Sequence, residues 1–360
     1  MENNDRKYWV ALSNYTKFGP AMFERLLNYF DSMEEAFKAS LAELRSAGIP
    51  EKTAEGFVHL RSEIDVEALW AQIERNNVTV LLITDDAYPP LLKTIYDPPP
   101  LLYIRGNLPA PEVPHLAVVG SRKATPYGIR VTRDLTEELA EAGVVIVSGL
   151  AYGIDEAAHS ATMTGKGVTL AILGCGLGML NSRGRHVAQK IVEGGGAVIS
   201  EFPIKMGGLR HNFPIRNRII SGMSHGTLVI EAAIKSGSLI TAKSALEQAR
   251  EVFAIPGQIY SETSSGTNQL IKDGAHLVTC AEDILSALQV ERIEANALPP
   301  LPPANKEEAS ILELLSKNPI HIDELTRQTD LNASQVASTL GILEIKGRTR
   351  QIGGMYYILV

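Results

Sequence analysis

Short apolar runs alternate with amphipathic helical segments between residues 115 and 290. HLAVVGS, VVIVSG, VTLAILG and GTLVIEA are rich in β-branched residues, and each precedes a stretch with helical periodicity. The first of these stretches, PYGIRVTRDLTEELAEAG, has Pro126 near its start and Gly143 at its end, as helix ends favour. Strands joined by such helices predict βαβ units, and therefore an α/β fold with a doubly wound parallel sheet. Ligands of such sheets bind beyond the carboxyl ends of the strands.

The region before this alternation follows a helical pattern over residues 8–70. FGPAMFERLLNYF places Met22, Leu26, Leu27 and Phe30 on one helical face, and AELRSAGIPEKTAEGFVHL predicts two helices joined by a Gly-Ile-Pro turn. Such a hairpin either touches a DNA phosphate through its turn amides or belongs to a bundle that only packs. From residue 76 a strand followed by Pro-rich turns is expected to wrap the edge of the next domain.

The last part of the chain predicts a linker and a winged helix. ERIEANALPPLPPANK is rich in Pro and Ala and has no periodicity, which is typical of a linker. Three short helical patterns and the Gly-broken hairpin RTRQIGGMYYILV follow it. The third pattern has no Arg or Lys between Asn332 and Ile345, which favours a protein-contact module over a reader of DNA bases. We therefore expect a helical domain (1–75), a sheet domain (76–290), a linker (291–305) and a winged helix (306–360).

Composition excludes several classes of protein. The 360 residues carry 34 Lys and Arg against 41 Asp and Glu, so a generally basic nucleic-acid coat is excluded but a local basic groove is not. Cys175 and Cys280 are the only cysteines and form no Cys/His cluster, which argues against structural zinc and fits a reducing compartment. No signal-peptide core or membrane-spanning apolar run occurs, so we expect a cytoplasmic protein without a membrane span.

The turns at the strand ends suit phosphate rather than a nucleotide cofactor. Neither G-x-x-x-x-G-K-[ST] nor G-x-G-x-x-G occurs, so the sequence predicts neither a P-loop nor a dinucleotide-binding fingerprint. Ser121 and Arg122 lie between a strand and a predicted helix N-terminus, where free amides attract anions. Ser238 opens another predicted helix, with Thr241 and Lys243 one turn later. Alternatively, Ser238 serves only as a helix cap.

The stretch RHNFPIRNRII gathers cations, amides and one aromatic residue. Pro214 predicts a loop before it and a helix start near Ile215, which puts Arg216 and Arg218 in the first turn. There they oppose the helix dipole unless an anion binds.

The two arginines are two residues apart and cannot share a face, so one is expected to reach the ligand while the other pairs with Glu201 or Glu231. Arg210 and Phe213 in the loop would then supply a cation and a stacking platform, as proteins that hold single-stranded nucleic acid do. The alternative is that Phe213 belongs to the core and the arginines form salt bridges.

Several long motifs resemble the DNA processing protein A (DprA, also Smf) family. They are GSR, SGLAYGIDEAAH, NFPIRNRIISGMSHGTLVIEAAIKSGSLITAKSALEQAREVFAIPG and GTNQLIKDGA, in order between His115 and Leu288. The resemblance implies an extended Rossmann-like doubly wound parallel sheet, an N-terminal sterile-alpha-motif-like helical domain and a C-terminal winged helix. It also implies a bacterial protein that binds single-stranded DNA regardless of sequence. Such a protein receives incoming DNA in natural transformation and loads RecA recombinase onto it.

The resemblance further implies a homodimer formed through the Rossmann-like domain, no cofactor and no enzymatic activity. Carried over by motif and joined to the interpretation above, the DNA-binding set is Ser121, Arg122, Arg210, Asn212, Phe213, Arg216, Arg218, Ser238, Thr241 and Lys243. One segment departs from the family: residues 177–186 read LGMLNSRGRH, where a Tyr-Pro pair and an Asn are expected.

Two other functions remain open. Nucleoside-monophosphate phosphoribohydrolases carry a Gly-Thr before a strand and a Glu after it, so HGTLVIEA with Arg218 would make Glu231 a catalytic carboxylate. MSHGT lacks the Pro-Gly-Gly that those enzymes carry before the Gly-Thr. A scaffold for partner proteins that does not itself bind DNA is the other alternative.

Overall fold

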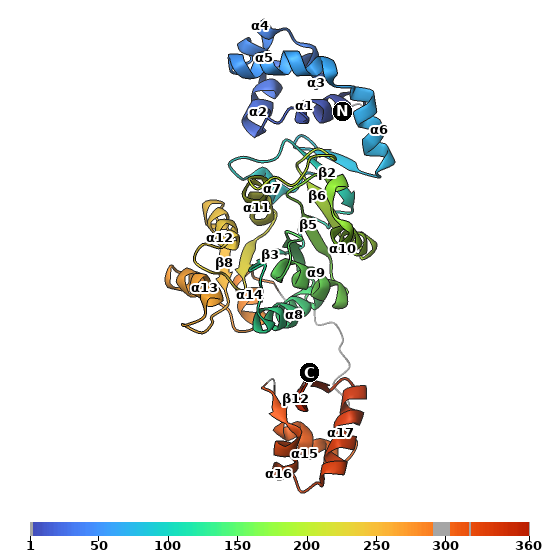
Figure 1. The fold of residues 1–360 in the computed structure, drawn as a ribbon, viewed down its shortest axis with the longest axis vertical. Coiled ribbons are helices and arrows are strands. Elements are labelled where there is room, and N and C mark those ends of the chain that lie inside the picture. Colours follow the sequence, from blue (N-terminus) through green and yellow to red (C-terminus); the bar gives the residue numbers. More distant parts are fainter. Residues whose placement is uncertain (1–2, 291–302, 317, 360) are drawn as a thin grey trace. The chain divides into compact units, whose positions relative to one another are not determined.

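The computed structural model describes residues 3–290, 303–316 and 318–359 and separates into two compact units (Figure 1). Unit 1 spans residues 1–293 and unit 2 spans residues 294–360. The linker predicted at 291–305 falls mostly outside the described residues.

Unit 1 contains a sheet in the order β1-β2-β6-β5-β4-β3-β7-β8-β9. The strands are β1 (Thr79–Leu82), β2 (Leu101–Gly106), β3 (His115–Val119), β4 (Val145–Ser148), β5 (Thr169–Ile172), β6 (Ala197–Ser200), β7 (Gly226–Val229), β8 (Glu251–Ala254) and β9 (His276–Leu277). From β6 to β9 all pairings are parallel, whereas β1–β2 and β2–β6 are antiparallel. The predicted doubly wound sheet is confirmed. The segment after residue 76 adds two strands to this sheet in addition to its Pro-rich turns.

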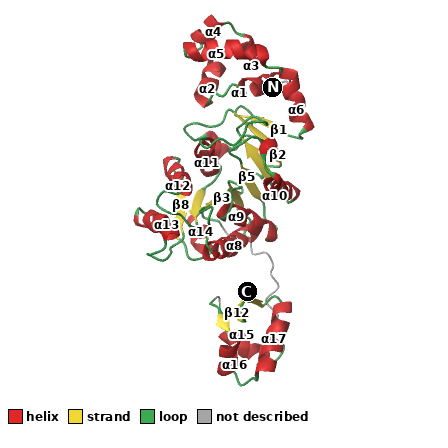
Figure 2. Ribbon diagram, viewed as in Figure 1, coloured by secondary structure: helices red, strands yellow, loops and turns green. Residues whose placement is uncertain are grey.

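Helices cover both faces of the sheet (Figure 2). They are α7 (Pro90–Lys93), α8 (Pro126–Glu141), α9 (Ile154–Thr164), α10 (Ser182–Glu193), α11 (Asn212–Gly222), α12 (Gly237–Glu247), α13 (Glu262–Lys272) and α14 (Ala281–Ala287). The alternation within β3 explains the two layers. Leu116 and Val118 join a core with α8, α9 and α14, while Ala117 and Val119 join another with α7, α11 and α12.

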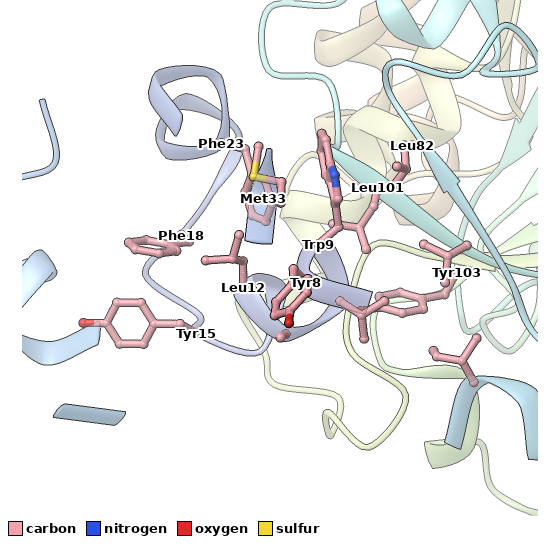
Figure 3. Packing of buried hydrophobic residues seen from close by; sticks show 14 of the residues in the cluster. Tyr8, Trp9, Leu12, Tyr15, Phe18, Phe23, Met33, Leu82, Leu101 and Tyr103 are labelled. Carbon is pink, nitrogen blue, oxygen red and sulfur yellow. The ribbon is translucent and has the colours of Figure 1, made fainter. Parts of the chain in front are cut away.

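The N-terminal helices pack on one end of this sheet. They are α1 (Asn3–Ser13), α2 (Pro20–Tyr29), α3 (Met33–Lys38), α4 (Leu41–Ser46), α5 (Glu51–Leu60) and α6 (Val66–Arg75). Figure 3 shows their aromatic core, with Trp9 and Phe23, continuing to Tyr103 of β2. Arg6 donates to the Val80 carbonyl at 2.9 Å, so a helix side chain caps the edge of β1.

Unit 2 is a winged helix, as predicted. It contains α15 (Lys306–Leu314), β10 (Ile320–His321), α16 (Ile322–Gln328), α17 (Ala333–Ile345), β11 (Thr349–Gln351) and β12 (Tyr356–Leu359). The strands form a sheet in the order β10-β12-β11. Val336, Leu340 and Leu343 bury one face of α17 in the core. The other face of α17 carries exposed Ile342 and Ile345 and no cation.

Candidate nucleic-acid interface

A cleft opens at the carboxyl ends of β3 and β7. These strands are neighbours, and the order of the sheet reverses between them, because β3 leads to α8 on one face and β7 leads to α12 on the other. Ligands of doubly wound sheets bind at this switch point. The switch-point cleft has a volume of about 900 Å³ and is lined by residues from 119–123, 210–217, 233–241 and 262–263, with Ala151, Asp155 and Ile220.

The turn after β3 carries Ser121 and Arg122 into the cleft. Ser121 accepts a hydrogen bond from the Lys123 amide at 3.1 Å, and its carbonyl accepts one from Ile154 at 3.3 Å. Gly153, at φ +83°, packs against this turn, and a Cβ there would collide with the Ser121 carbonyl oxygen. The turn precedes α8 rather than forming its first turn, since the N-cap residue is Thr125. Arg122 is exposed and forms no ion pair within the described residues.

Helix α11 begins earlier than the sequence predicts. It starts at Asn212, so the predicted loop through Pro214 and helix start near Ile215 were wrong. Pro214 is the third residue of the helix, where a missing backbone N–H costs no helical hydrogen bond. Phe213 therefore lies in the first turn and Arg216 in the second. The expected opposition between the arginines and the helix dipole does not arise, because the dipole acts within the first turn.

Phe213 lines the cleft and is half-buried. One edge of its ring packs against Gly174, where a Cβ would lie 2.7 Å from ring atom Cδ1. The Arg122 guanidinium carbon lies 5.3 Å from the ring centroid, within cation–π range. The ring is thus packed at one edge and open to the cleft, so Phe213 is neither wholly a core residue nor free of packing.

Arg216 lines the bottom of the cleft and is only 3% exposed. It donates to the Gly149 carbonyl at 2.8 Å and to the Ile172 carbonyl. Buried Asp155 accepts from the amides of Gly149 and Ala151 at 3.1 and 3.3 Å. Burial lowers the pKa of Arg216 to about 10 and raises the pKa of Asp155. Arg216 and Asp155 both bond to Gly149, the residue after β4, and so hold α11 against the end of that strand. Arg216 therefore has a structural role at the bottom of the cleft.

Arg218 is the arginine that pairs with Glu201, as expected for one of the two. Its distances are 2.6 Å to Glu201 and 2.8 Å to Asp97. Arg218 does not line the cleft, and neither does buried Asn212, whose side-chain amide donates to the Gly207 carbonyl at 3.4 Å. Their placement in the DNA-binding set is not supported, because both side chains are engaged inside the protein.

Helix α12 supplies the opposite wall. Its N-cap is Ser236, which accepts from the Ser238 amide at 3.4 Å, so the alternative that Ser238 is the cap was wrong. Ser238 and Thr241 are buried and line the cleft. Lys243 does not line the cleft. It is exposed and lies 3.6 Å from Glu247, one turn along the helix.

Two lysines of the cleft were missed by sequence reasoning. Lys123 and Lys235 line it and are exposed. The sequence contained a signal for both, because Lys123 follows Arg122 directly and Lys235 lies three residues before Ser238, in the two turns already predicted to suit phosphate. With Arg210 and Arg122 they make four exposed cations, against Glu262 as the one exposed carboxylate among the lining residues. The cleft therefore suits an anion despite the net charge of −7.

The residues of the proposed enzyme site lie elsewhere. Glu231 is buried and accepts from the Thr125 amide at 2.9 Å and the Thr125 hydroxyl at 2.5 Å, which fixes the start of α8. Neither Glu231 nor Arg218 lines the cleft.

The described part of the chain lacks two further kinds of feature. It contains no group of three or more His, Cys, Asp or Glu placed to hold a metal ion. None of its helices combines the length and the apolar character needed to span a bilayer.

Comparison with protein families gives two matches. Residues 79–289 match the family described as DNA recombination-mediator protein A, and residues 295–355 match the DprA winged helix domain. Both agree with the family resemblance and the fold predicted from the motifs, which are confirmed.

Individual proteins agree with this result. Protein Smf of Escherichia coli is 47% identical over 249 residues, which cover 68% of this chain and 66% of that protein. The X-ray structure of DNA processing protein A from Streptococcus pneumoniae superimposes with a TM-score of 0.68 at 35% identity, over 78% of this chain and 97% of that one. A Helicobacter pylori DNA processing protein A structure, described for its single-stranded DNA binding mode, has a TM-score of 0.53 at 28% identity, over 59% and 95% of the two chains.

Proposed function

Because the chain belongs to the DNA recombination-mediator protein A family, we propose that its switch-point cleft binds single-stranded DNA without sequence preference. The observation that carries the proposal is the gathering of four exposed cations around one half-exposed aromatic ring. The description of the H. pylori relative as a single-stranded DNA binder supports it.

Each kind of lining residue has a part in this binding. Arg122, Lys123, Arg210 and Lys235 meet backbone phosphates as exposed cations. The amides and hydroxyls at the start of α12 add neutral donors for one phosphate. Phe213 stacks on a base, which any base permits, so sequence matters little. Arg216 holds the bottom of the cleft in place rather than meeting the strand.

Preference for single strands follows from the ring. Phosphate contacts alone accept either form of DNA, because both carry the charge. A duplex hides its base faces in the stack and, with a persistence length of about 150 bp, does not bend into a cleft at a sheet edge. Phe213 therefore contributes only when the bases are unpaired.

A competition experiment tests this. Fluorescence anisotropy with a labelled single strand should show it binding more than about tenfold tighter than a blunt duplex of the same sequence, at equal salt. The Lys243→Ala variant removes an exposed cation outside the cleft. It should bind the single strand as tightly as the natural protein does and show the same preference over duplex. Equal competition by the duplex would contradict the proposal.

We propose the family's wider role on the same basis. The protein would receive incoming single strands in the cytoplasm during natural transformation and load RecA recombinase onto them, as a homodimer formed through the sheet domain. The parts at 1–75, 76–290 and 306–360 would be its functional domains, with the first two packed together on a shared hydrophobic core in one compact unit. RecA-dependent strand exchange on strands pre-coated with a single-strand-binding protein should accelerate when this protein is added, and sedimentation should give twice the chain mass. If strand exchange does not accelerate although the protein binds the single strand, the proposal of RecA loading fails and the proposal of DNA binding stands.

A further inference from the structure

We propose that Tyr152 is a second base-stacking position for single-stranded DNA, next to the Phe213 position. The inference rests on the proposed function and extends it beyond the switch-point cleft. Tyr152 does not itself line that cleft, although its neighbour Ala151 does.

The ring of Tyr152 is both exposed and held in place. It is 54% exposed, and the Arg183 guanidinium carbon lies 5.2 Å from its centroid. Arg183 is fixed in turn by Glu156, through hydrogen bonds of 2.9 and 2.8 Å from Nε and Nη2. Asn181 also donates to the Tyr152 hydroxyl at 3.5 Å. An exposed ring that already has such contacts should lose less conformational entropy when a ligand binds. Surface tyrosines without such support do not have this advantage.

The position of Tyr152 places it beside the proposed DNA path. It follows β4, whose parallel neighbour β3 carries the Arg122 turn at its carboxyl end. The next residue, Gly153, packs against that turn, and a Cβ there would lie 2.9 Å from the Arg122 carbonyl oxygen. Two arginine–aromatic pairs therefore stand on neighbouring turns of one sheet edge, Arg122 with Phe213 and Arg183 with Tyr152. We therefore infer that a DNA strand leaving the cleft over the Arg122 turn would meet the Tyr152 ring next.

The departure from the family pattern at 177–186 contributes to this platform. Asn181 caps α10, accepting from the Gly184 amide at 2.8 Å, and Arg183 leaves the first turn of that helix toward Tyr152. Since the Arg183 charge is balanced by Glu156 at 2.7 Å, the platform offers stacking without a new phosphate contact. Replacing Arg122 should therefore change the salt dependence of DNA affinity, whereas replacing Tyr152 should not.

The test uses the full chain with two ligands, an oligothymidylate and an abasic strand of the same length. Tyr152→Ala should weaken oligothymidylate binding by roughly 5- to 150-fold, the loss expected for one stacked base. Tyr152→Phe should bind within about twofold of the natural protein, because the stacking face is retained. The slope of log affinity against log salt should not change, and the abasic strand should bind the natural protein and Tyr152→Ala equally.

Other results overturn the inference in distinguishable ways. If the natural protein binds oligothymidylate but Tyr152→Ala binds it equally, Tyr152 is not a stacking position and the cleft proposal stands. If the natural protein binds neither ligand, the proposed function itself fails. An equal loss on both ligands would show a structural role for Tyr152. Tyr152→Leu keeps the apolar bulk, and normal oligothymidylate binding by that variant would also overturn the inference.

Discussion

Replacing Phe213 separates stacking from packing. Truncation to Ala removes a ring that is half-buried, with one edge against Gly174 and the Arg122 guanidinium 5.3 Å from its centroid. A fully buried Phe→Ala change costs about 3–5 kcal/mol of stability, so a half-buried one should cost about 2 kcal/mol. Loss of one stacked base should cost a further 1–3 kcal/mol, roughly 5- to 150-fold, in affinity for single-stranded DNA.

Phe213→Leu is the matched control. Leucine retains most of the apolar contact with Gly174, so the free energy of unfolding should fall by less than about 1.5 kcal/mol. It cannot stack on a base, so its DNA affinity should fall almost as far as that of Phe213→Ala. Urea unfolding measures the first quantity, and fluorescence anisotropy with a labelled single strand measures the second.

The comparison of the two variants decides the role of the ring. If Phe213→Leu binds single-stranded DNA like the natural protein, the ring acts through packing and the stacking hypothesis is wrong. Both variants should keep the salt dependence of the natural protein, because neither removes a phosphate contact.

Three further changes test other parts of the molecule. Arg122→Ala or Arg210→Ala should weaken single-strand binding and flatten the slope of log affinity against log salt by about 0.7 each, without early thermal unfolding; an unchanged slope would remove that residue from the site. Residues 1–290 should bind single strands nearly as well as the whole chain, because every lining residue lies between 119 and 263; a filter-binding assay in which truncation abolishes binding would refute this. Burial beside Arg216 lowers the pKa of His159 to about 3, so the unfolded chain binds a proton near pH 6.5 that the folded chain does not. The contribution of His159 to the free energy of unfolding is therefore fully present above pH 6.5 and should fall by about 2 kcal/mol by pH 5, as measured by urea unfolding. The His159→Gln variant should lose less stability over the same pH range.

Much of the sheet domain could be predicted because its signals are local. The alternation of apolar runs and amphipathic helices depends on neighbouring residues, so it identified the strands from β3 to β8 and the helices between them. The Gly-Ser-Arg turn after β3 was recognised for the same reason, and it does line the cleft. The family motifs added the identity of the fold, which the comparisons confirm.

The start of α11 shows where local signals fail. Pro214 is a strong helix breaker in a helix interior, but it is tolerated in a first turn. The chain before it provides Asn212 and Phe213 as helical residues, and the ring of Phe213 gains contact with Gly174, far away in the sequence. Tertiary packing therefore decided where the helix begins.

The sequence by itself determined that the chain holds a doubly wound sheet with cations and one aromatic residue in its strand-end turns. It did not determine which of those cations are free. Arg210, Arg216 and Arg218 lie within nine residues, yet only Arg210 is exposed. Arg216 donates hydrogen bonds to the carbonyls of Gly149 and Ile172. Arg218 forms ion pairs with Glu201 and Asp97. A buried charge must find partners, and those partners come from strands and loops far along the chain, so only the tertiary structure decides which arginine is left to meet a ligand.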